Sequence, residues 1–226
     1  MSYPFDAPER ANQDNILKVV MQKFFVAMLI VFIGMVIGMK FVPITLVNIV
    51  PIITLVCIIW AVMVRGSRSS RHSYKESNPV SMGFVYFISF TIGVGIYPAI
   101  VYHVSHTGAT MVLTALGITT ALFGGLTLYA STSQRSFVSW GTTLFFSLLL
   151  IIIFSIVNLF LHAPLLFLAL SIVGAIVFSA YVLYDISIIR NSDITEEDVP
   201  FAVLNLVLDF VNLFEEILNI VSFFRR

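Results

Sequence analysis

Four carboxyl groups lie within the last two of seven long apolar segments, and they are the first residues in the sequence that point to chemistry. Asp185 lies in the sixth segment, and Asp209, Glu215 and Glu216 lie in the seventh. An ionisable side chain in the middle of a membrane-spanning helix costs about 2.5–3.5 kcal/mol on insertion scales. Residues that carry such a cost usually serve a function, so these two segments are where we expect a site.

A stripe of polar residues follows one face of the seventh segment: Asn205, Asp209, Asn212, Glu216 and Asn219. Its members are separated by steps of four, three, four and three residues, and at about 100° per residue they share an arc of about 80°. A stripe of this length cannot face lipid, so we expect it to line water as an ion path or to join helices as a hydrogen-bonded seam. The seventh helix is therefore expected to be a central one.

Asp185 and Asp209 are related by their distance from the turn between the two segments. They lie twelve residues before and twelve residues after position 197. Thr195 is typical of a helix N-cap, and Asp198 three residues later is typical of a capping box. In an antiparallel helical hairpin, residues equidistant from the turn lie at a similar depth. The two carboxyl groups are therefore expected to be able to meet inside the protein.

Such a carboxyl pair predicts a response to protons. Two carboxylates that share a buried site cannot both ionise cheaply, so the pair is expected to hold a proton between them. Loss of that proton adds a second negative charge, which either repels the helices or attracts a cation. Arg65, at the end of the second apolar segment, is the best-placed arginine to neutralise this charge.

The same residue types favour calcium over zinc. Hard cations such as calcium prefer carboxylate and amide oxygens, which the polar stripe supplies. We expect calcium as a permeant or weakly bound ligand, with Asp185 and Asp209 as candidate ligands, and no tightly bound cofactor. Zinc is not expected, because no cysteine accompanies the histidines predicted near the opposite surface: His103, His106 and His162.

The composition indicates the environment of these residues. Hydrophobic residues make up 59% of the 226-residue chain, charged residues make up 11%, and the mean hydropathy is +1.01. Soluble domains have about 45–50% apolar and about 25% charged residues, so this chain cannot cover a water-facing surface. It is expected to be an all-α integral membrane protein. Twelve basic and twelve acidic residues give no net charge that would favour nucleic acid, and the single Cys57 excludes an internal disulfide.

Seven segments are predicted to span the bilayer, which takes about 17–25 residues, although the first segment is short: 24–39, 44–64, 80–102, 109–130, 137–161, 164–189 and 199–224. Residues 1–20 are polar, so we expect a cytoplasmic N-terminal tail without a cleavable signal peptide, followed by a seven-helix domain over residues 21–226. With the N-terminus inside, nine Lys and Arg residues lie inside and three outside, which predicts a C-terminus outside the membrane.

Small residues and one proline are expected to shape the packing of the helices. Gly34 and Gly38 have a spacing typical of close helix contacts, and Gly124 and Gly125 are predicted to pack in the same way. Pro98 lies inside the third segment and is expected to kink that helix.

Three stretches resemble the C-terminal signature of the Bax inhibitor family, which is also called the transmembrane Bax inhibitor motif family and has bacterial members. They are Tyr184-Asp185, the stretch Ile194 to Pro200, and the stretch Leu208 to Phe214. The third segment from Gly93 to Pro98 and the fourth from Ala115 to Leu128 are also similar. The resemblance extends from about residue 17 to the C-terminus.

The resemblance implies seven helices, with the last one wrapped by two three-helix layers. It also implies a pH-sensitive calcium leak, in which Asp185 and Asp209 are the pH sensor and Arg65 is a latch on one of them. The sequence departs from the family at Thr54, where some bacterial relatives carry an acid. It also departs at the additional acids Glu215 and Glu216, and at Arg135-Ser136 in place of a Lys-Asp pair.

Two other functions stay open. One is a membrane regulatory or interaction protein in stress or protein quality control, without conduction of its own, that contacts membrane protein partners through the N-terminal tail. The other is a proton-coupled transporter of a small solute. An enzyme is not expected, because Leu206-Val207-Leu208 stands where an intramembrane aspartic protease needs Gly-x-Gly before its aspartate. Besides the lipid bilayer, the expected partners are calcium and protons, and the compact loops favour a bacterial inner membrane.

Overall fold

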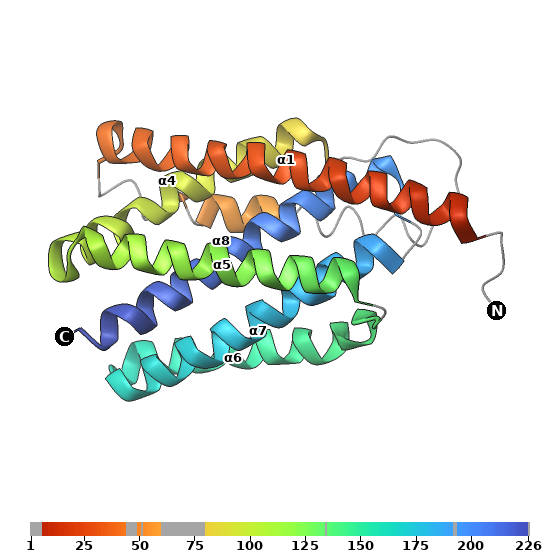
Figure 1. The fold of residues 1–226 in the computed structure, drawn as a ribbon. Helices are drawn as coiled ribbons and strands as arrows, with labels where there is room; N and C mark the ends of the chain where they lie inside the picture. Colours follow the sequence, from red (N-terminus) through yellow and green to blue (C-terminus); the bar gives the residue numbers. More distant parts are fainter. Residues whose placement is uncertain are drawn as a thin grey trace. The chain divides into compact units, whose positions relative to one another are not determined.

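The fold is described from a computed structural model of the chain (Figure 1). It describes residues 6–43, 49–50, 52–59, 80–133, 135–191 and 194–225, with side chains from residue 13 onward. In these ranges all the regular secondary structure is helical, which confirms the all-α class. The elements are α1 (Asp6–Phe41), α4 (Met82–Thr107), α5 (Ala109–Thr132), η1 (Val138–Trp140), α6 (Gly141–Leu161), α7 (Pro164–Asn191), η2 (Glu196–Asp198) and α8 (Val199–Phe223).

These helices lie close to the predicted segments. The third to seventh segments match α4, α5, η1 with α6, α7 and α8, with ends that differ by a few residues. Of the second segment, 44–64, residues 49–50 and 52–59 are described, and all of them except Ile49 are helical. Among the described residues, five helical spans are long and apolar enough to cross a membrane: α1 from Gln13, α4, α5, Val138–Leu161 and α7.

The first helix differs most from its predicted bounds. It begins at Asp6 rather than near residue 21, so residues 6–20 of the predicted tail continue the helix of the first span. The reason is a buried seam that starts before the apolar run. The seam follows one helical face at steps of three and four residues, and its members are Ile16, Val20, Phe24, Ala27 and Val31.

The described chain forms two compact units. The first contains Met1–Val101 and Ile194–Val207, and the second contains Tyr102–Asp193 and Leu208–Arg226. The helices α4 and α8 therefore each contribute residues to both units. Pro98 lies inside α4, which continues through it as one helix, and the kink predicted there stays a prediction.

Glycines bring α1 and α4 into close contact within the first unit. A Cβ atom at Gly34 would collide with the backbone of Phe90, and one at Gly38 would lie 2.7 Å from Cδ1 of Tyr97. This confirms the prediction for Gly34 and Gly38. The Tyr97 hydroxyl also donates a hydrogen bond of 2.6 Å to the carbonyl oxygen of Val42. For Gly124 and Gly125 the close contact stays a prediction, because no atom of the described residues lies within 4 Å of a Cβ atom at either position.

The change Gly93→Ala is expected to lower stability, although alanine is the better helix former by about 1 kcal/mol. A Cβ atom at Gly93 would collide with the carbonyl oxygen of Val31 and lie 2.9 Å from the backbone nitrogen of Met35. The two backbones must separate, and overpacking of this kind costs about 1–3 kcal/mol. Thermal unfolding in detergent measures the effect. Gly117→Ala is the matched control, since no atom of a described residue lies within 4 Å of its Cβ position. Equal melting temperatures for the two variants would contradict the prediction.

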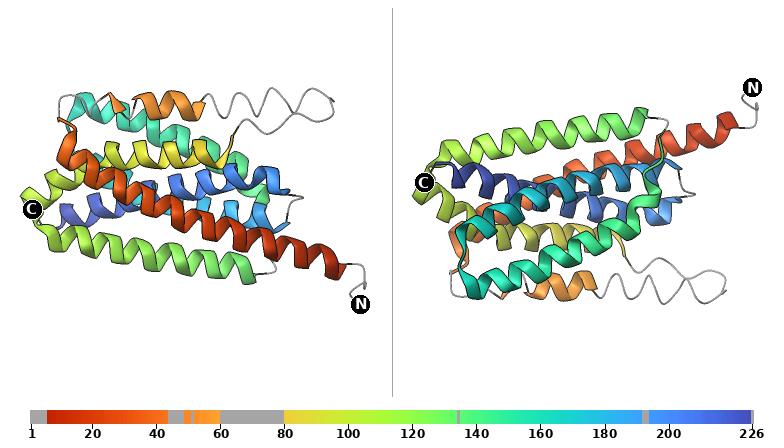
Figure 2. Two further views of the ribbon diagram at one scale, coloured as in Figure 1. Left: turned by 90° about the horizontal axis from the view of Figure 1, so that it is seen from above. Right: turned by 90° about the horizontal axis from the view of Figure 1, so that it is seen from below.

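In the second unit, α7 packs against both α5 and α6 (Figure 2). The face of α5 that is buried repeats every three or four residues: Ala115, Thr119, Phe123, Thr127 and Ala130. The start of α6 is tied to α7, because the Phe137 backbone nitrogen donates a hydrogen bond of 2.9 Å to Oγ of Ser187. Arg190 near the end of α7 donates to the carbonyl oxygens of Ala130 and Ser133. A cation is favourable there because a helix C-terminus carries partial negative charge.

The helix α8 combines charge with burial. It is not among the five apolar spans, because any 18-residue stretch of it contains Asp209, Glu215 and Glu216. Nevertheless, no residue from Val199 to Phe223 is exposed. This burial agrees with the expectation of a central seventh helix. Its enclosure by two three-helix layers stays a prediction.

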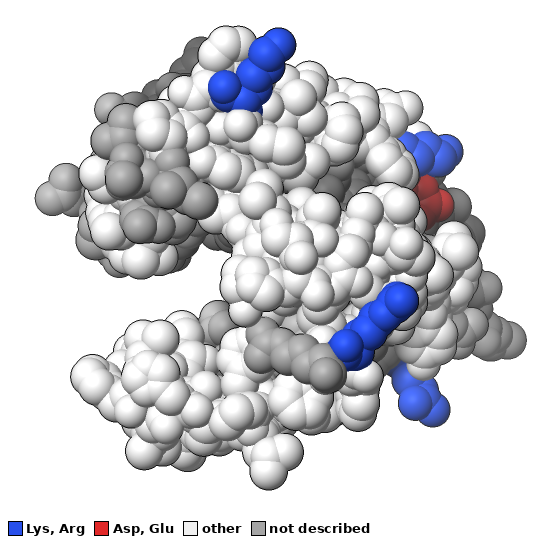
Figure 3. All heavy atoms as spheres, turned by 90° about the vertical axis from the view of Figure 1, so that its left-hand side faces the viewer, with Lys and Arg blue, Asp and Glu red and all other residues white. Residues whose placement is uncertain are grey.

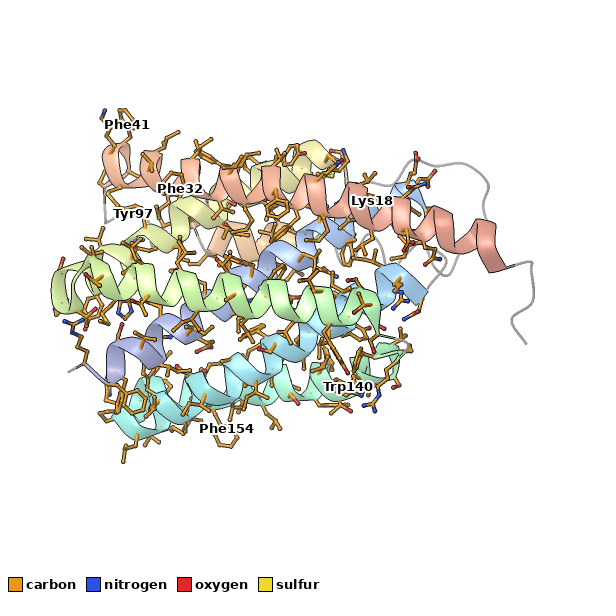
Figure 4. The ribbon with its side chains drawn as sticks, in the orientation of Figure 1. Lys18, Phe32, Phe41, Tyr97, Trp140 and Phe154 are labelled. Carbon is orange, nitrogen blue, oxygen red and sulfur yellow. The ribbon has the colours of Figure 1, made fainter. Side chains whose placement is uncertain are left out.

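The exposed surface of the other helices is apolar, as expected for contact with lipid. Phe32 on α1 is 58% exposed and Phe154 on α6 is 48% exposed. Figure 4 shows Phe154 at the outer edge of α6. In the space-filling view of Figure 3, Lys, Arg, Asp and Glu are sparse on the face shown. Residues with this exposure in water would be an aggregation hazard, whereas lipid accepts them. The chain is an integral membrane protein.

Candidate functional site

The site is built on the two helices that follow one another at the C-terminal end of the sequence. Asp185 lies in the last third of α7, and Asp209 lies near the middle of α8. The start of the second helix has the predicted cap: Thr195 and Asp198 form a capping box, with the Thr195 backbone nitrogen 3.3 Å from Oδ2 of Asp198. This cap belongs to η2, which leads directly into α8.

The structure brings Asp185 and Asp209 together inside the second unit. Their side chains are 7% and 6% exposed, and the two carboxyl groups lie within hydrogen-bonding reach of each other. A hydrogen bond between two carboxyl groups requires a proton on one of them. Oδ2 of Asp209 is buried and accepts no hydrogen bond from any described residue. A buried carboxylate oxygen in this position calls for a proton, a water molecule or a cation.

Aromatic residues surround the pair. Tyr181 is one helical turn before Asp185 on α7 and lies near both carboxyl groups. Its ring packs edge-on against Tyr184, with centroids 6.3 Å apart. Beside Asp209, the ring of Phe210 packs edge-on against Phe123 of α5 at 5.3 Å.

The sequence reasoning did not assign a role to Tyr181. Its spacing of four residues from Asp185 places both side chains on one helical face, and this spacing is the signal that could have found it. Tyr184 was noted for the family signature alone. In the structure its hydroxyl lies against Gly141, where a Cβ atom would be 2.7 Å away, so it also fixes the start of α6 against α7.

The predicted latch Arg65 lies outside the described residues. Within the described part of the chain, no Lys or Arg side chain forms an ion pair with Asp185 or Asp209. Arg190 follows Asp185 by five residues, but it binds the C-terminal end of α5 as described above. Thr54, which replaces an acid of some relatives, is buried and donates a hydrogen bond of 2.9 Å to the carbonyl oxygen of Val50.

The pair offers few ligands for a metal ion. Among the described residues, no group of three or more His, Cys, Asp or Glu side chains is arranged to hold one. Calcium takes six to eight oxygen ligands. A calcium ion at Asp185 and Asp209 would therefore keep most of its water molecules, as a permeant ion does.

The polar stripe of α8 is divided between the two units. Asn205 belongs to the first unit, whereas Asp209, Asn212, Glu216 and Asn219 belong to the second. Asn212 is partly buried, one turn beyond Asp209. Glu216 and Asn219 line a cavity of about 350 Å³. The stripe thus leads from the carboxyl pair to this cavity along one helical face.

The whole membrane-spanning region matches a known family. Residues 13–226 match the family described as "Inhibitor of apoptosis-promoting Bax1". The chain belongs to the Bax inhibitor family. The match includes both helices of the carboxyl pair and all the described helices except the first turns of α1.

Relatives occur in bacteria and in animals. An uncharacterized protein of Campylobacter jejuni is 35% identical over 66% of this chain and 64% of its own length. An uncharacterized membrane protein of Vibrio cholerae is 31% identical over 63% of this chain and 64% of its own length. Mouse protein lifeguard 4 is 28% identical over 65% of this chain and 59% of its own length. The chain thus aligns with a little under two thirds of the length of these relatives.

Proposed function

We propose that the protein is a pH-sensitive calcium leak of the membrane, with Asp185 and Asp209 as the pH sensor. The observation that carries this proposal is the pair itself: two carboxyl groups within reach of each other, buried between two helices. No packing requirement explains such a pair, because apolar side chains of similar volume would fill the same space at lower cost. The two carboxyl groups of this pair can hold one proton between them.

In this proposal the proton controls the charge of the site. When the proton leaves, the pair carries two negative charges and binds Arg65, which closes the path along the polar stripe. When the proton returns, the attraction to Arg65 weakens, and the leak increases as the pH falls. Asn212, Glu216 and Asn219 continue the path beyond the pair, with oxygen atoms that suit a hydrated cation.

Family membership supports a function at a membrane, but it does not by itself select conduction. The family description refers to the inhibition of a protein that promotes apoptosis. The two alternative functions are therefore a regulatory protein and a proton-coupled transporter, and experiments must distinguish a calcium leak from both. A bacterial inner membrane with the N-terminus in the cytoplasm is part of the proposal.

Reconstitution in liposomes tests whether the protein conducts at all. Vesicles that contain a calcium-sensitive dye and the purified full chain should take up calcium from the medium faster than protein-free vesicles at about pH 6. An ionophore added at the end gives the total capacity. No uptake above the protein-free rate, with protein shown to be folded and inserted, would contradict the leak and favour a regulatory function.

A further inference from the structure

A second polar site lies away from the aspartate pair, where the end of α6 meets the start of α7. Two adjoining cavities of about 370 and 350 Å³ lie there within the second unit. They share four lining residues, Asn158, His162, Phe167 and Asn219. Such volumes suit a small molecule rather than a bare ion.

Glu216 is the carboxylate of this site. Ser171 of α7 and Asn219 of α8 lie within hydrogen-bonding reach of it. The space for its side chain comes from Gly174, where a Cβ atom would lie 2.7 Å from Oε1 of Glu216. None of the described residues that line either cavity is a lysine or an arginine. A ligand that complements this carboxylate must therefore bring its own positive charge.

The other polar groups of the cavities are mainly acceptors. Nδ1 of His162 lies 3.2 Å from the carbonyl oxygen of Phe160, which can only accept, so in the neutral ring Nε2 is left as an acceptor. Oδ1 of Asn158 accepts a hydrogen bond of 3.1 Å from the Ala163 backbone nitrogen. Ser222 lines the larger cavity at 3% exposure, and its hydroxyl has no hydrogen-bond partner among the described residues.

We propose that these cavities form a binding site for the ammonium group of a small amine, with Glu216 as its counter-ion. A primary ammonium group has three donors, and Glu216 lines the same cavity as two further acceptors, the imidazole of His162 and the side-chain oxygen of Asn158. The rest of the lining is largely apolar, and Phe167 offers an aromatic face to a cation. A metal ion is the poorer match, because Glu216 and His162 lack a third His, Cys, Asp or Glu beside them among the described residues.

The ammonium group can come from two sources, a free amine in water or the ethanolamine headgroup of a lipid. Binding is measured with the full chain in nanodiscs of phosphatidylglycerol, which has no amine. Butylamine is the probe, and butanol is its uncharged counterpart. We expect saturable binding of butylamine, seen by calorimetry and as a rise in melting temperature, and no such effect of butanol.

Two matched variants test the role of the carboxylate. Glu216→Gln keeps the size of the side chain and is expected to weaken butylamine binding about tenfold or more, since a charge-assisted contact is lost. Glu215→Gln makes the same change one residue away, outside the cavity lining, and should bind as the wild type does. The melting temperature of each variant without amine shows whether it is folded.

Nanodiscs of phosphatidylethanolamine separate the two sources. Weaker butylamine binding in them, restored in phosphatidylglycerol, assigns the site to the lipid headgroup, and equal binding in both assigns it to a free amine. The proposal is wrong if wild-type protein binds butanol as well as butylamine. It is also wrong if Glu216→Gln leaves the affinity unchanged, or if calcium binds at Glu216 while butylamine does not.

Discussion

Replacing Asp209 with asparagine is expected to abolish the pH dependence of calcium flux. The amide keeps the shape of the side chain and its place beside Asp185, but it cannot gain or lose a proton in this range. The ratio of the flux at about pH 5 to the flux at about pH 8 should therefore fall to about one. Asp185→Asn is expected to have the same effect, because the proton belongs to the pair and not to either residue alone.

The double variant Asp185→Asn/Asp209→Asn should differ little from either single variant. Residues that act as one unit give effects that do not add. Asp14→Asn is the matched control, since Asp14 is exposed on α1 and distant in sequence from the pair, and it should retain the full pH response. A single variant that keeps the wild-type ratio would show that the sensor lies elsewhere in the chain.

A large loss of stability is expected for Leu213→Ala in α8. Leu213 is fully buried, and truncation of a buried leucine to alanine costs about 2–5 kcal/mol through lost packing and the cavity that remains. Leu159→Ala on α6 is the matched control, because Leu159 is 71% exposed. Its loss should change stability by less than about 1 kcal/mol.

The free energy of unfolding of these two leucine variants can be compared by denaturant titration in detergent. The difference between their two free energies of unfolding shows whether α8 is packed on its apolar faces as well as at its polar stripe. Equal stability of the two variants would show that Leu213 of α8 is not buried as the structure has it. This experiment does not measure conduction. It therefore tests the packing of α8 separately from the proposed calcium leak.

The relative positions of Asp185 and Asp209 could be predicted from the sequence because two local features determine them. The helical repeat sets the face of each side chain, and the equal distance from the capped turn sets the depth. Thr195 and Asp198 mark that turn by residue type alone. Geometry of this kind depends little on how the remaining helices pack.

Other features depend on contacts that no local pattern contains. The helix α1 continues before the predicted span, where Ile16 and Val20 are buried, whereas hydropathy alone places the start of the span near residue 21. Gly124 and Gly125 have the composition of a close helix contact, but their face of α5 has none among the described residues. Small residues permit close approach without causing it.

In α8, acidic residues cause a selection by hydropathy to miss a helix that is buried in the protein. Asp209, Glu215 and Glu216 remove α8 from the helices that length and hydropathy select as membrane spans. The same acids are tolerated because the helix is buried along its whole length. A polar stripe on a buried helix therefore indicates a functional helix rather than a weak span.

In the proposed function, the buried aspartate pair controls a calcium leak through its shared proton. The most direct test is calcium uptake by liposomes that contain the wild-type protein, measured in steps from about pH 5 to about pH 8 beside Asp185→Asn/Asp209→Asn. The account predicts uptake that rises as the pH falls in the wild type and stays constant in the double variant. Equal pH dependence in both proteins, or no uptake by folded wild-type protein at any pH, would contradict it.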